Sequence, residues 1–347
     1  MKDYFSVRWE DGIVRMLDQR LLPEKEVYYD YDKCSEVAEA IRKMVIRGAP
    51  AIGISAGFGL ALTAFHNQSN HAGKLLAELE TSANELRNSR PTAVNLFGAI
   101  DRIMGLVLRG NYLEAEQIKK MVVTEAQKIA DEDIKMNKSI ALNGQQFIPD
   151  HANLIHHCNT GALATGGYGT ALGVIRAAHE SGKKVHVFVD ETRPRLQGAR
   201  LTSWELKQLG IPHTVIVDGA SGYIMRNNKI DACLVGCDRI AANGDVANKI
   251  GTYNLALVAF AHGVPFFSVG PTTTIDLTIA SGDNIPIEER SEHEVTHVGE
   301  TQVTPNGVAV ENPAFDVTPA KYITAIITNA GVAFPPYEKS LAKIMNG

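Results

Sequence analysis

The feature that most constrains the fold is the alternation of short apolar runs with helical patterns from about residue 145 onward. Runs such as VHVFV at 185–189 and ACLVG at 232–236 are apolar at nearly every position, as in strands buried on both faces. Helical patterns follow at 198–209 and 248–262. This alternation predicts a parallel sheet wrapped by helices. We therefore expect an α/β fold in which residues 145–347 form a Rossmann-like domain.

The first part of the chain has a different pattern. Residues 34–45 and 72–88 show helical amphipathicity, and residues 5–18 predict a hairpin around Asp11-Gly12. A long helical pattern covers 113–144. At 347 residues the chain is long enough for two domains. We expect a smaller, mostly helical N-terminal domain with a small β hairpin at 1–125, and a connecting helix at 126–144.

Charge and composition exclude several classes of function. The net charge of −5 and the lack of a dense Lys/Arg cluster argue against a nucleic-acid partner. The longest apolar stretch, 51–65, is shorter than the ~20 residues of a membrane span and rich in glycine, so we expect a buried helix and no membrane partner. Four cysteines without framework spacing predict reduced thiols and a cytoplasmic protein.

Polar loops follow three of the predicted strands, after Cys158, Asp190 and Asp238. Ligands of open parallel sheets bind beyond the carboxyl ends of the strands, where such loops meet. Taken singly, a cysteine there is most often a small core residue and an aspartate a turn former. Together at one sheet edge, a thiol and a carboxylate favour an acid/base pair.

Two arginines precede predicted helix starts in the N-terminal domain. Arg47 and Gly48 come before Pro50, and Arg90 comes before Pro91. Most single arginines are surface residues. Two guanidinium groups beside free helix N–H groups favour phosphate recognition.

Other motifs predict no cofactor. Gly167, Gly169 and Gly173 have the wrong spacing for a dinucleotide fingerprint, and no P-loop occurs. HEVTH at 293–297 matches a zinc-protease pattern, but its surroundings lack a helical period, so we expect a polar surface loop. Residues 156–158, His-His-Cys, cannot converge on one metal because neighbours on a strand point to opposite faces.

Six segments resemble the methylthioribose-1-phosphate isomerase family, in order and across nearly the whole chain. The same fold is shared with ribose-1,5-bisphosphate isomerases and with regulatory subunits of the eukaryotic translation initiation exchange factor. The segments are IRGAPAIG, SRPTAVNL, CNTGALATGGYGTALGVIR, DETRPRLQGARLTSWEL, GCDRIAANGDVANKIGTYNLA and NPAFDVTP.

The resemblance implies an aldose-ketose isomerisation in methionine salvage, a route of methionine biosynthesis, that acts on a sugar phosphate with no metal or organic cofactor. It also implies a homodimer. The catalytic pair that it implies is Cys158 and Asp238. The implied substrate contacts are Arg47, Gly48, Ala49, Arg90, Gln197, Asn248 and Lys249.

The chemistry of such a substrate fits this pair. Phosphate on C1 blocks spontaneous ring opening, so an acid must protonate the ring oxygen. We expect an apolar pocket to raise the pKa of Asp238 so that it can donate. Hydrogen must then move from C2 to C1, through an enolate with Cys158 exchanging protons or as a hydride shift. The sequence leaves both routes open.

Two alternative functions remain. One is an isomerase for another 1-phosphopentose, such as ribose 1,5-bisphosphate or 5-deoxyribose 1-phosphate. The other is a non-catalytic regulatory subunit that binds sugar phosphates, against which the presence of both Cys158 and Asp238 argues. The chain departs from the family pattern at Cys237, where we expect alanine, and at Asn329, where we expect an acid. A second thiol beside Asp238 predicts sensitivity to oxidation.

Overall fold

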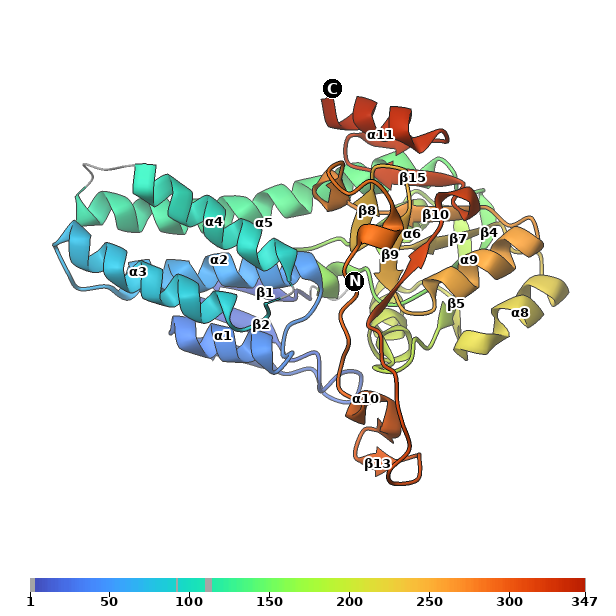
Figure 1. The fold of residues 1–347 in the computed structure, drawn as a ribbon, viewed down its shortest axis with the longest axis horizontal. Coiled ribbons are helices and arrows are strands. Elements are labelled where there is room, and N and C mark those ends of the chain that lie inside the picture. The colour runs from blue at the N-terminus through green and yellow to red at the C-terminus, as the bar shows by residue number, and fades with distance from the viewer. Residues whose placement is uncertain (1–3, 92, 110–113, 347) are drawn as a thin grey trace. The chain divides into compact units, whose positions relative to one another are not determined.

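The computed structural model describes residues 4–91, 93–109 and 114–346, and its contacts divide the chain into two compact units. Of the described residues, those within 4–135 and 162–167 form the helical unit, and those within 136–161 and 168–346 form the sheet unit. Figure 1 shows the elements of both.

A small antiparallel sheet opens the helical unit. It consists of β1 (Val7–Glu10), β2 (Ile13–Leu17) and β3 (Tyr28–Tyr31) in that order. Asp11 and Gly12 connect the first two strands with φ of 44° and 86°, the left-handed backbone that a two-residue hairpin turn needs. The predicted hairpin is therefore confirmed, and the third strand is an addition that the sequence pattern did not reveal.

Helix α2 is the centre of the helical unit. It has the length and hydropathy of a membrane span, yet 72% of it is buried, which confirms the predicted core helix. Gly53 permits close packing, because a β-carbon there would lie 2.8 Å from the Asn95 carbonyl oxygen on α4. The helices of this unit are α1 (Cys34–Arg42), α2 (Ala49–His66), α3 (Ala72–Arg87), α4 (Val94–Arg109) and the first part of α5 (Ala115–Gln145).

Helix α5 passes from one unit into the other. The predicted connecting helix, 126–144, forms the second part of this 31-residue helix. The chain later returns to the helical unit at 162–167, a segment that we had placed inside 145–347. Ser6 Oγ donates to the Thr165 carbonyl at 2.6 Å, and Gln19 Nε2 donates to the Leu163 carbonyl at 2.7 Å. Side chains of the helical unit therefore anchor the returning segment.

The sheet unit is built on seven strands in the order β16-β15-β10-β7-β4-β5-β6. All neighbours are parallel except the edge strand β16, which is antiparallel to β15. The strands are β4 (His151–His156), β5 (Lys184–Asp190), β6 (His213–Ile216), β7 (Ala232–Val235), β10 (Phe266–Val269), β15 (Ala325–Thr328) and β16 (Gly331–Ala333).

Alternate residues of these strands face two separate cores. Leu154 and Leu234 pack with side chains of α6 and α7, whereas Ile155 and Val235 pack with side chains of α8, α9 and α11. Helices therefore cover both faces of the sheet, which confirms the predicted α/β class. The helices are α6 (Ala171–Glu180), α7 (Ser203–Leu209), α8 (Ser221–Asn227), α9 (Thr252–Ala261) and α11 (Tyr337–Asn346).

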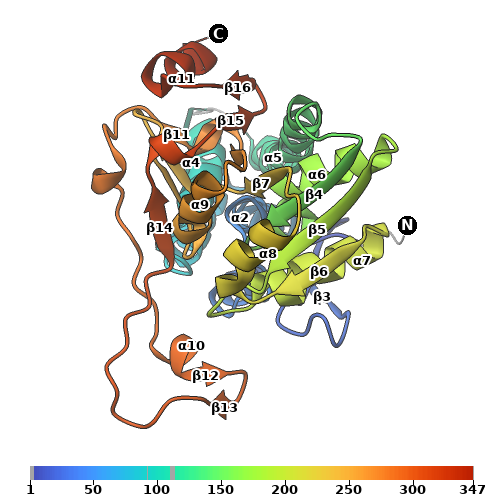
Figure 2. The same cartoon turned by 90° about the vertical axis from the view of Figure 1, so that its right-hand side faces the viewer.

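Two features of the sheet unit were not predicted. A second sheet has the order β11-β8-β9-β14, and an arm at 286–312 projects away from the strands (Figure 2). The arm carries a one-turn helix and a two-stranded sheet. The additional elements are β8 (Arg239–Ala241), β9 (Val246–Lys249), β11 (Ile275–Asp276), β14 (Phe315–Thr318), α10 (His293–Thr296), β12 (His297–Val298) and β13 (Thr301–Gln302).

Candidate active site

The loops after β4 and β7 meet at the carboxyl edge of the main sheet. The two strands pair in parallel, with His156 opposite Leu234. Beyond the strands, a β-carbon on Gly236 would lie 2.8 Å from the Thr160 methyl group, so the two loops are in close contact. This register carries Cys158, on the first loop, and Asp238, on the second, to one edge of the sheet, as the sequence predicted.

Cys158 lies in a strained and tightly held turn. Its φ is 67°, which is rare for a residue other than glycine and costs on the order of 1 kcal/mol. Its backbone N–H donates to Thr192 Oγ1 at 2.9 Å, and its carbonyl accepts from Thr202 Oγ1 at 2.6 Å. The side chain is buried. Two threonines therefore fix the position of the thiol independently of any ligand.

Asp238 occupies the point where the chain leaves the main sheet for the second one. Its backbone N–H donates to the Ala247 carbonyl at 2.9 Å, which starts the pairing of β8 with β9. Its side chain is exposed. This exposure differs from the apolar pocket that we expected around Asp238.

Cys237 differs chemically from its neighbour. Burial raises the pKa of its thiol to about 12, and Sγ lies 3.3 Å from Thr274 Oγ1. The side chain is half-buried, and a β-carbon on Gly270 would collide with its sulfur, so the thiol packs against the Gly270 backbone. Because oxidation proceeds through the thiolate, the sensitivity to oxidation that we predicted for Cys237 is not supported.

Gln197 lies on the loop that follows β5. Its side chain is buried, and its Oε1 has no hydrogen-bond partner among the residues that the structure describes. A buried unsatisfied oxygen is costly unless a ligand pairs with it. The next residue, Gly198, packs so closely that any β-carbon would collide with the Asp190 carbonyl oxygen. The loop is thereby held against the end of β5.

Asn248 and Lys249 are the last two residues of β9. We expected them at the start of the helical pattern 248–262, but α9 begins only at Thr252. Asn248 is buried and donates through Nδ2 to Thr252 Oγ1 at 2.9 Å. Lys249 Nζ donates to the Ala314 carbonyl at 2.8 Å and lies 4.7 Å from the centre of the Phe315 ring. These contacts with the β14 strand region fix the direction of the ammonium group.

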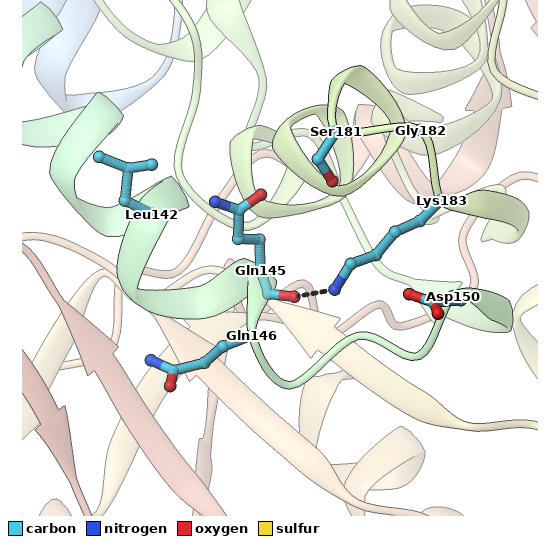
Figure 3. Close-up of a pocket in the computed structure, with 7 residues that line it drawn as sticks. All are labelled: Leu142, Gln145, Gln146, Asp150, Ser181, Gly182 and Lys183. Atoms are coloured by element: carbon cyan, nitrogen blue, oxygen red, sulfur yellow. Dashed lines mark hydrogen bonds between the residues drawn. The ribbon is translucent and has the colours of Figure 1, made fainter.

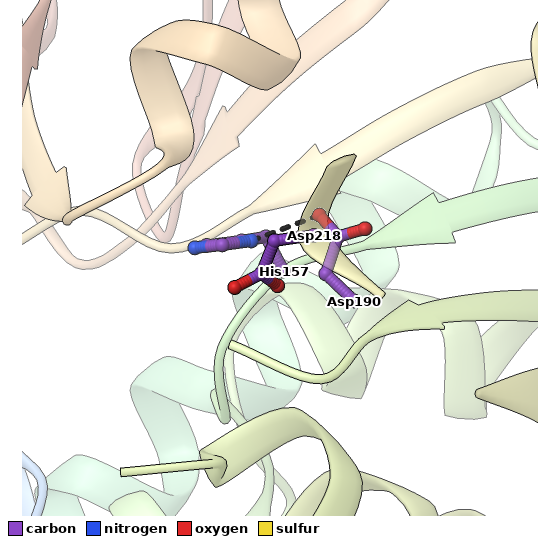
Figure 4. Close-up of side chains that lie close together, drawn as sticks. All are labelled: His157, Asp190 and Asp218. Carbon is purple, nitrogen blue, oxygen red and sulfur yellow. Dashed lines mark hydrogen bonds and ion pairs between the residues drawn. The ribbon is translucent and has the colours of Figure 1, made fainter. Parts of the chain in front are cut away.

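His157 and Asp190 form a buried pair at the same edge (Figure 4). His157 Nδ1 lies 2.9 Å from Asp190 Oδ2, and both side chains are almost inaccessible. Burial alone would lower the pKa of His157, but the hydrogen bond and charge of Asp190 outweigh burial and raise it. Burial also raises the pKa of Asp190. The pair therefore retains its protons to higher pH than either group would in water.

Asp218 completes this cluster, which is the one described group of His, Cys, Asp and Glu close enough to share a metal ion. Its two oxygens accept the N–H groups of Thr192 and Arg193 at 2.7 Å each. The ligand atoms of the cluster are thus engaged in hydrogen bonds. We had noted Asp190 as a strand-end acid, but its pairing with His157 became visible only in the structure.

In the helical unit, Arg47, Gly48 and Ala49 form the start of α2. Gly48 is the cap residue, with φ of 93°, and its carbonyl accepts from Ile52 N at 2.9 Å. A β-carbon on Gly48 would lie 2.5 Å from Ala164, in the segment that returns to this unit. The predicted helix start before Pro50 is confirmed. Arg47 is half-buried beside it.

The second predicted helix start is displaced. Helix α4 begins at Val94, three residues beyond Pro91. The cause is a turn in which Ala93 N donates to the Arg90 carbonyl at 3.0 Å, after which the Ala93 carbonyl accepts from Leu96 and Phe97. Arg90 is half-buried and precedes the helix by a full turn instead of adjoining it.

Residues 293–296 of the HEVTH segment form a one-turn helix on the projecting arm, instead of the loop that we expected, and His297 begins β12. Glu294 pairs with Arg195 at 2.8 Å and with Arg290 at 2.6 Å. Burial would raise the pKa of Glu294, but the two guanidinium groups lower it to about 2. A carboxylate held in this way braces the arm against the loop of Gln197 and is unsuited to act as a general base.

A cavity lies at the opposite edge of the main sheet (Figure 3). Its volume is about 730 Å³, and Asp150, Ser181 and Lys183 contribute to its wall. Lys183 Nζ donates to the Gln145 and Ile148 carbonyls at 2.8 and 2.6 Å. The ammonium group therefore caps the carboxyl end of α5. The cavity adjoins the amino ends of β4 and β5, away from the edge where parallel sheets bind ligands.

Known proteins match nearly the whole chain. The Initiation factor 2 subunit family matches residues 45–335. A methylthioribose-1-phosphate isomerase of Synechococcus sp. is 53% identical over 99% of both chains. The crystal structure of 5-methylthioribose 1-phosphate isomerase from Pyrococcus horikoshii OT3 is 46% identical, with a TM-score of 0.96 over 99% of this chain and 96% of that one.

A second solved structure carries a different name. Translation initiation factor eIF-2B, subunit delta, from A. fulgidus is 40% identical, with a TM-score of 0.92 over 99% of this chain and all of that one. The chain therefore belongs to the Initiation factor 2 subunit family and, within it, groups with relatives named methylthioribose-1-phosphate isomerase.

Proposed function

We propose that this protein converts 5-methylthioribose 1-phosphate to 5-methylthioribulose 1-phosphate, an aldose-ketose isomerisation of methionine salvage. The observation that carries the proposal is the identity of more than half of the residues, over the full length, with relatives named for this activity. The thiol of Cys158 and the carboxyl group of Asp238 at one sheet edge support it.

The proposed reaction begins with ring opening. Asp238 is the acid that we assign to the ring oxygen, and its exposed side chain is accessible to a substrate. The Asp238 proton passes to the ring oxygen as the bond between that oxygen and C1 breaks, which leaves C1 electron-poor. C1 then accepts the hydrogen from C2, and the C2 hydroxyl returns its proton to the Asp238 carboxylate as C2 becomes the carbonyl. In a proton-transfer route, Cys158 exchanges protons at C1 and C2. In a hydride shift, hydrogen passes directly from C2 to C1, and Cys158 only contacts the substrate. Neither route needs a metal or an organic cofactor.

We assign binding roles to the remaining polar groups. Lys249 supplies a positive charge with a fixed direction, and Gln197 supplies a buried oxygen that a sugar hydroxyl can satisfy. Asn248 lies beside the Gly236 backbone, within 3.6 Å of a β-carbon built there. In the helical unit, Arg47, with Gly48 and Ala49, and Arg90 are the proposed phosphate contacts.

We also propose that the protein works as a homodimer in the cytoplasm. The resemblance to the isomerase family supports the homodimer, and the four free cysteines, Cys34, Cys158, Cys233 and Cys237, support a reducing compartment. Light scattering of the purified protein and fractionation of cells measure the two properties.

Phosphorus and proton NMR test the activity. The purified protein is treated with EDTA and incubated in deuterated water with 5-methylthioribose 1-phosphate, ribose 1,5-bisphosphate or 5-deoxyribose 1-phosphate. Conversion of the first substrate alone is the expected result, and deuterium at C1 of the product marks the proton-transfer route. Faster conversion of another sugar would instead identify an isomerase for that 1-phosphopentose.

The A. fulgidus structure motivates the second candidate function, a regulatory subunit that binds sugar phosphates without turning them over. Such a protein would show saturable binding of the sugar phosphates by calorimetry and no product by NMR. The same samples therefore distinguish the two functions.

A further inference from the structure

The ring of His157 contacts a hydrogen-bond acceptor at each nitrogen. Nδ1 lies 2.9 Å from Asp190 Oδ2, and Nε2 lies 2.9 Å from the Ile250 carbonyl oxygen. A carbonyl can only accept, so Nε2 carries a proton. Ser221 Oγ donates to the other Asp190 oxygen at 3.1 Å, which favours the ionised carboxylate. With Asp190 ionised, the ring donates from both nitrogens, which only the imidazolium form can do.

The two acceptors belong to different parts of the site. His157 directly precedes Cys158, and Ile250 directly follows Lys249. The ring consequently links the loop of the proposed catalytic thiol to the turn of the proposed binding residues. The fit leaves no spare room, because a β-carbon on Gly251 would lie 2.9 Å from His157 Cε1.

The neighbouring charges favour a protonated ring. Asp218 adds to the effect of Asp190 on His157, and Asp316 interacts with His157 electrostatically while capping Gly251 N at 2.7 Å. Lys249 is a positive charge in the same region, and it interacts electrostatically with Asp316. Three carboxyl groups thus act on the His157 ring, and one of them, Asp316, also acts on Lys249.

His156 provides a contrast one residue away. Its Nδ1 donates to the Leu234 carbonyl at 2.8 Å, and its Nε2 lies 3.4 Å from Thr160 Oγ1, a hydroxyl that can donate in return. Burial lowers the pKa of His156 to about 4. Two adjacent and equally buried histidines are therefore predicted to differ in charge because their acceptors differ.

We propose that His157 is a positioning residue of the isomerase reaction, whose ring donates to Asp190 and to the Ile250 carbonyl and so fixes the turn of Asn248 and Lys249 relative to the loop of Cys158. The inference rests on the proposed function. Cys158 has its own anchors in Thr192 and Thr202, so the link acts mainly on the binding residues.

NMR of the wild-type protein tests the protonation state directly. Protein containing ¹⁵N-labelled histidine is titrated from pH 6 to pH 9, and His157→Asn and His156→Asn samples assign the two signals. We expect protons on both ring nitrogens of His157 at pH 7 and on Nδ1 alone in His156. A His157 ring with a single proton at pH 7 would overturn the double-donor arrangement.

Kinetics of the same two variants test the role. The amide of His157→Asn can reach only one of the two acceptors, so we expect KM for 5-methylthioribose 1-phosphate to rise about tenfold, the loss of one charge-assisted hydrogen bond, with a smaller change in kcat. His156→Asn is the matched control, in which Tm falls while KM and kcat of the folded enzyme stay unchanged.

The outcomes separate this inference from the proposed function. If the wild-type protein does not turn over the substrate, the proposed function fails, whatever the NMR titration shows. If the wild type is active and His157→Asn lowers only Tm, the positioning role fails while the proposed function stands.

Discussion

The start of α2 and the carboxyl edge of the main sheet place their candidate residues by different means. At the start of α2, Arg47, Gly48 and Ala49 are consecutive, and a capping glycine with Pro50 defines their geometry. At the sheet edge, the candidates come from the loops after β4, β5 and β7 and from the end of β9. The first region depends on local backbone preferences, whereas the second depends on strand order and on contacts between loops.

This difference predicts different responses to mutation. Changes in the helical unit should weaken binding without altering the chemistry. Changes at the sheet edge should alter the chemistry, the stability or both, because each loop there is supported by the others.

The largest expected effect is at the catalytic pair of the sheet edge. Cys158→Ser and Asp238→Asn should each lower kcat on the order of 10³-fold with little change in KM, since general acid/base groups contribute ~10²- to 10⁴-fold. Steady-state kinetics with 5-methylthioribose 1-phosphate measure both constants. Cys237→Ala is the control and should behave like the wild type, because the raised pKa of that thiol keeps it protonated. Activity of Cys158→Ser equal to the wild type would exclude a catalytic thiol.

The next effect concerns the start of α2. Arg47→Ala should raise KM by roughly 10- to 100-fold, the ~1.5 to 3 kcal/mol of a hydrogen bond to a charged group, and leave kcat nearly unchanged. Arg47→Lys should recover part of the loss, since it keeps the charge without the planar fork. Arg42→Ala, at the exposed end of α1, is the control. A fall in kcat with constant KM would show that Arg47 acts in the chemical step. The start of α2 and the sheet edge would then not differ in the way proposed.

A stability effect is expected at Gly198. Any β-carbon there collides with the Asp190 carbonyl, so Gly198→Ala must displace the loop of Gln197 and should cost on the order of 2 kcal/mol or more. Thermal unfolding followed by circular dichroism measures the loss. Gly219→Ala, where a β-carbon meets nothing within 4 Å, is the matched control. Equal melting temperatures for the two variants would show that the loop adapts freely.

The smallest effect is a pH dependence of stability. The pKa of His157 is raised in the folded protein, so its contribution is fully present below the unfolded value of about 6.5 and is lost as pH rises through the folded pKa. The upward shift of Asp190 has the same sign. Denaturant unfolding from pH 6 to pH 9 should therefore show stability falling with pH. The fall should be weaker in His157→Asn, and an identical slope in both proteins would assign it to other groups.

Much of the fold was predictable because its signals are local. The alternation of apolar runs and helices predicted the parallel sheet, Asp11-Gly12 predicted the hairpin, and the pattern at 51–65 predicted the core helix. The second sheet was missed because β8, β9 and β11 are only two to four residues long. The segment 162–167 was missed because its partners, Ser6, Gln19 and Asp133, are distant in the chain.

By itself the sequence determined the class of fold, the family, and the candidate residues at strand ends and helix starts. These signals depend on periodicity and turn residues, which involve only residues close together in the chain. Only the tertiary structure decided the exposure of Asp238, the packing of Cys237 against Gly270 and the different hydrogen-bond partners of His156 and His157. Those properties depend on which acceptors and carboxyl groups surround a side chain, and the neighbours concerned come from strands and loops far apart in the chain.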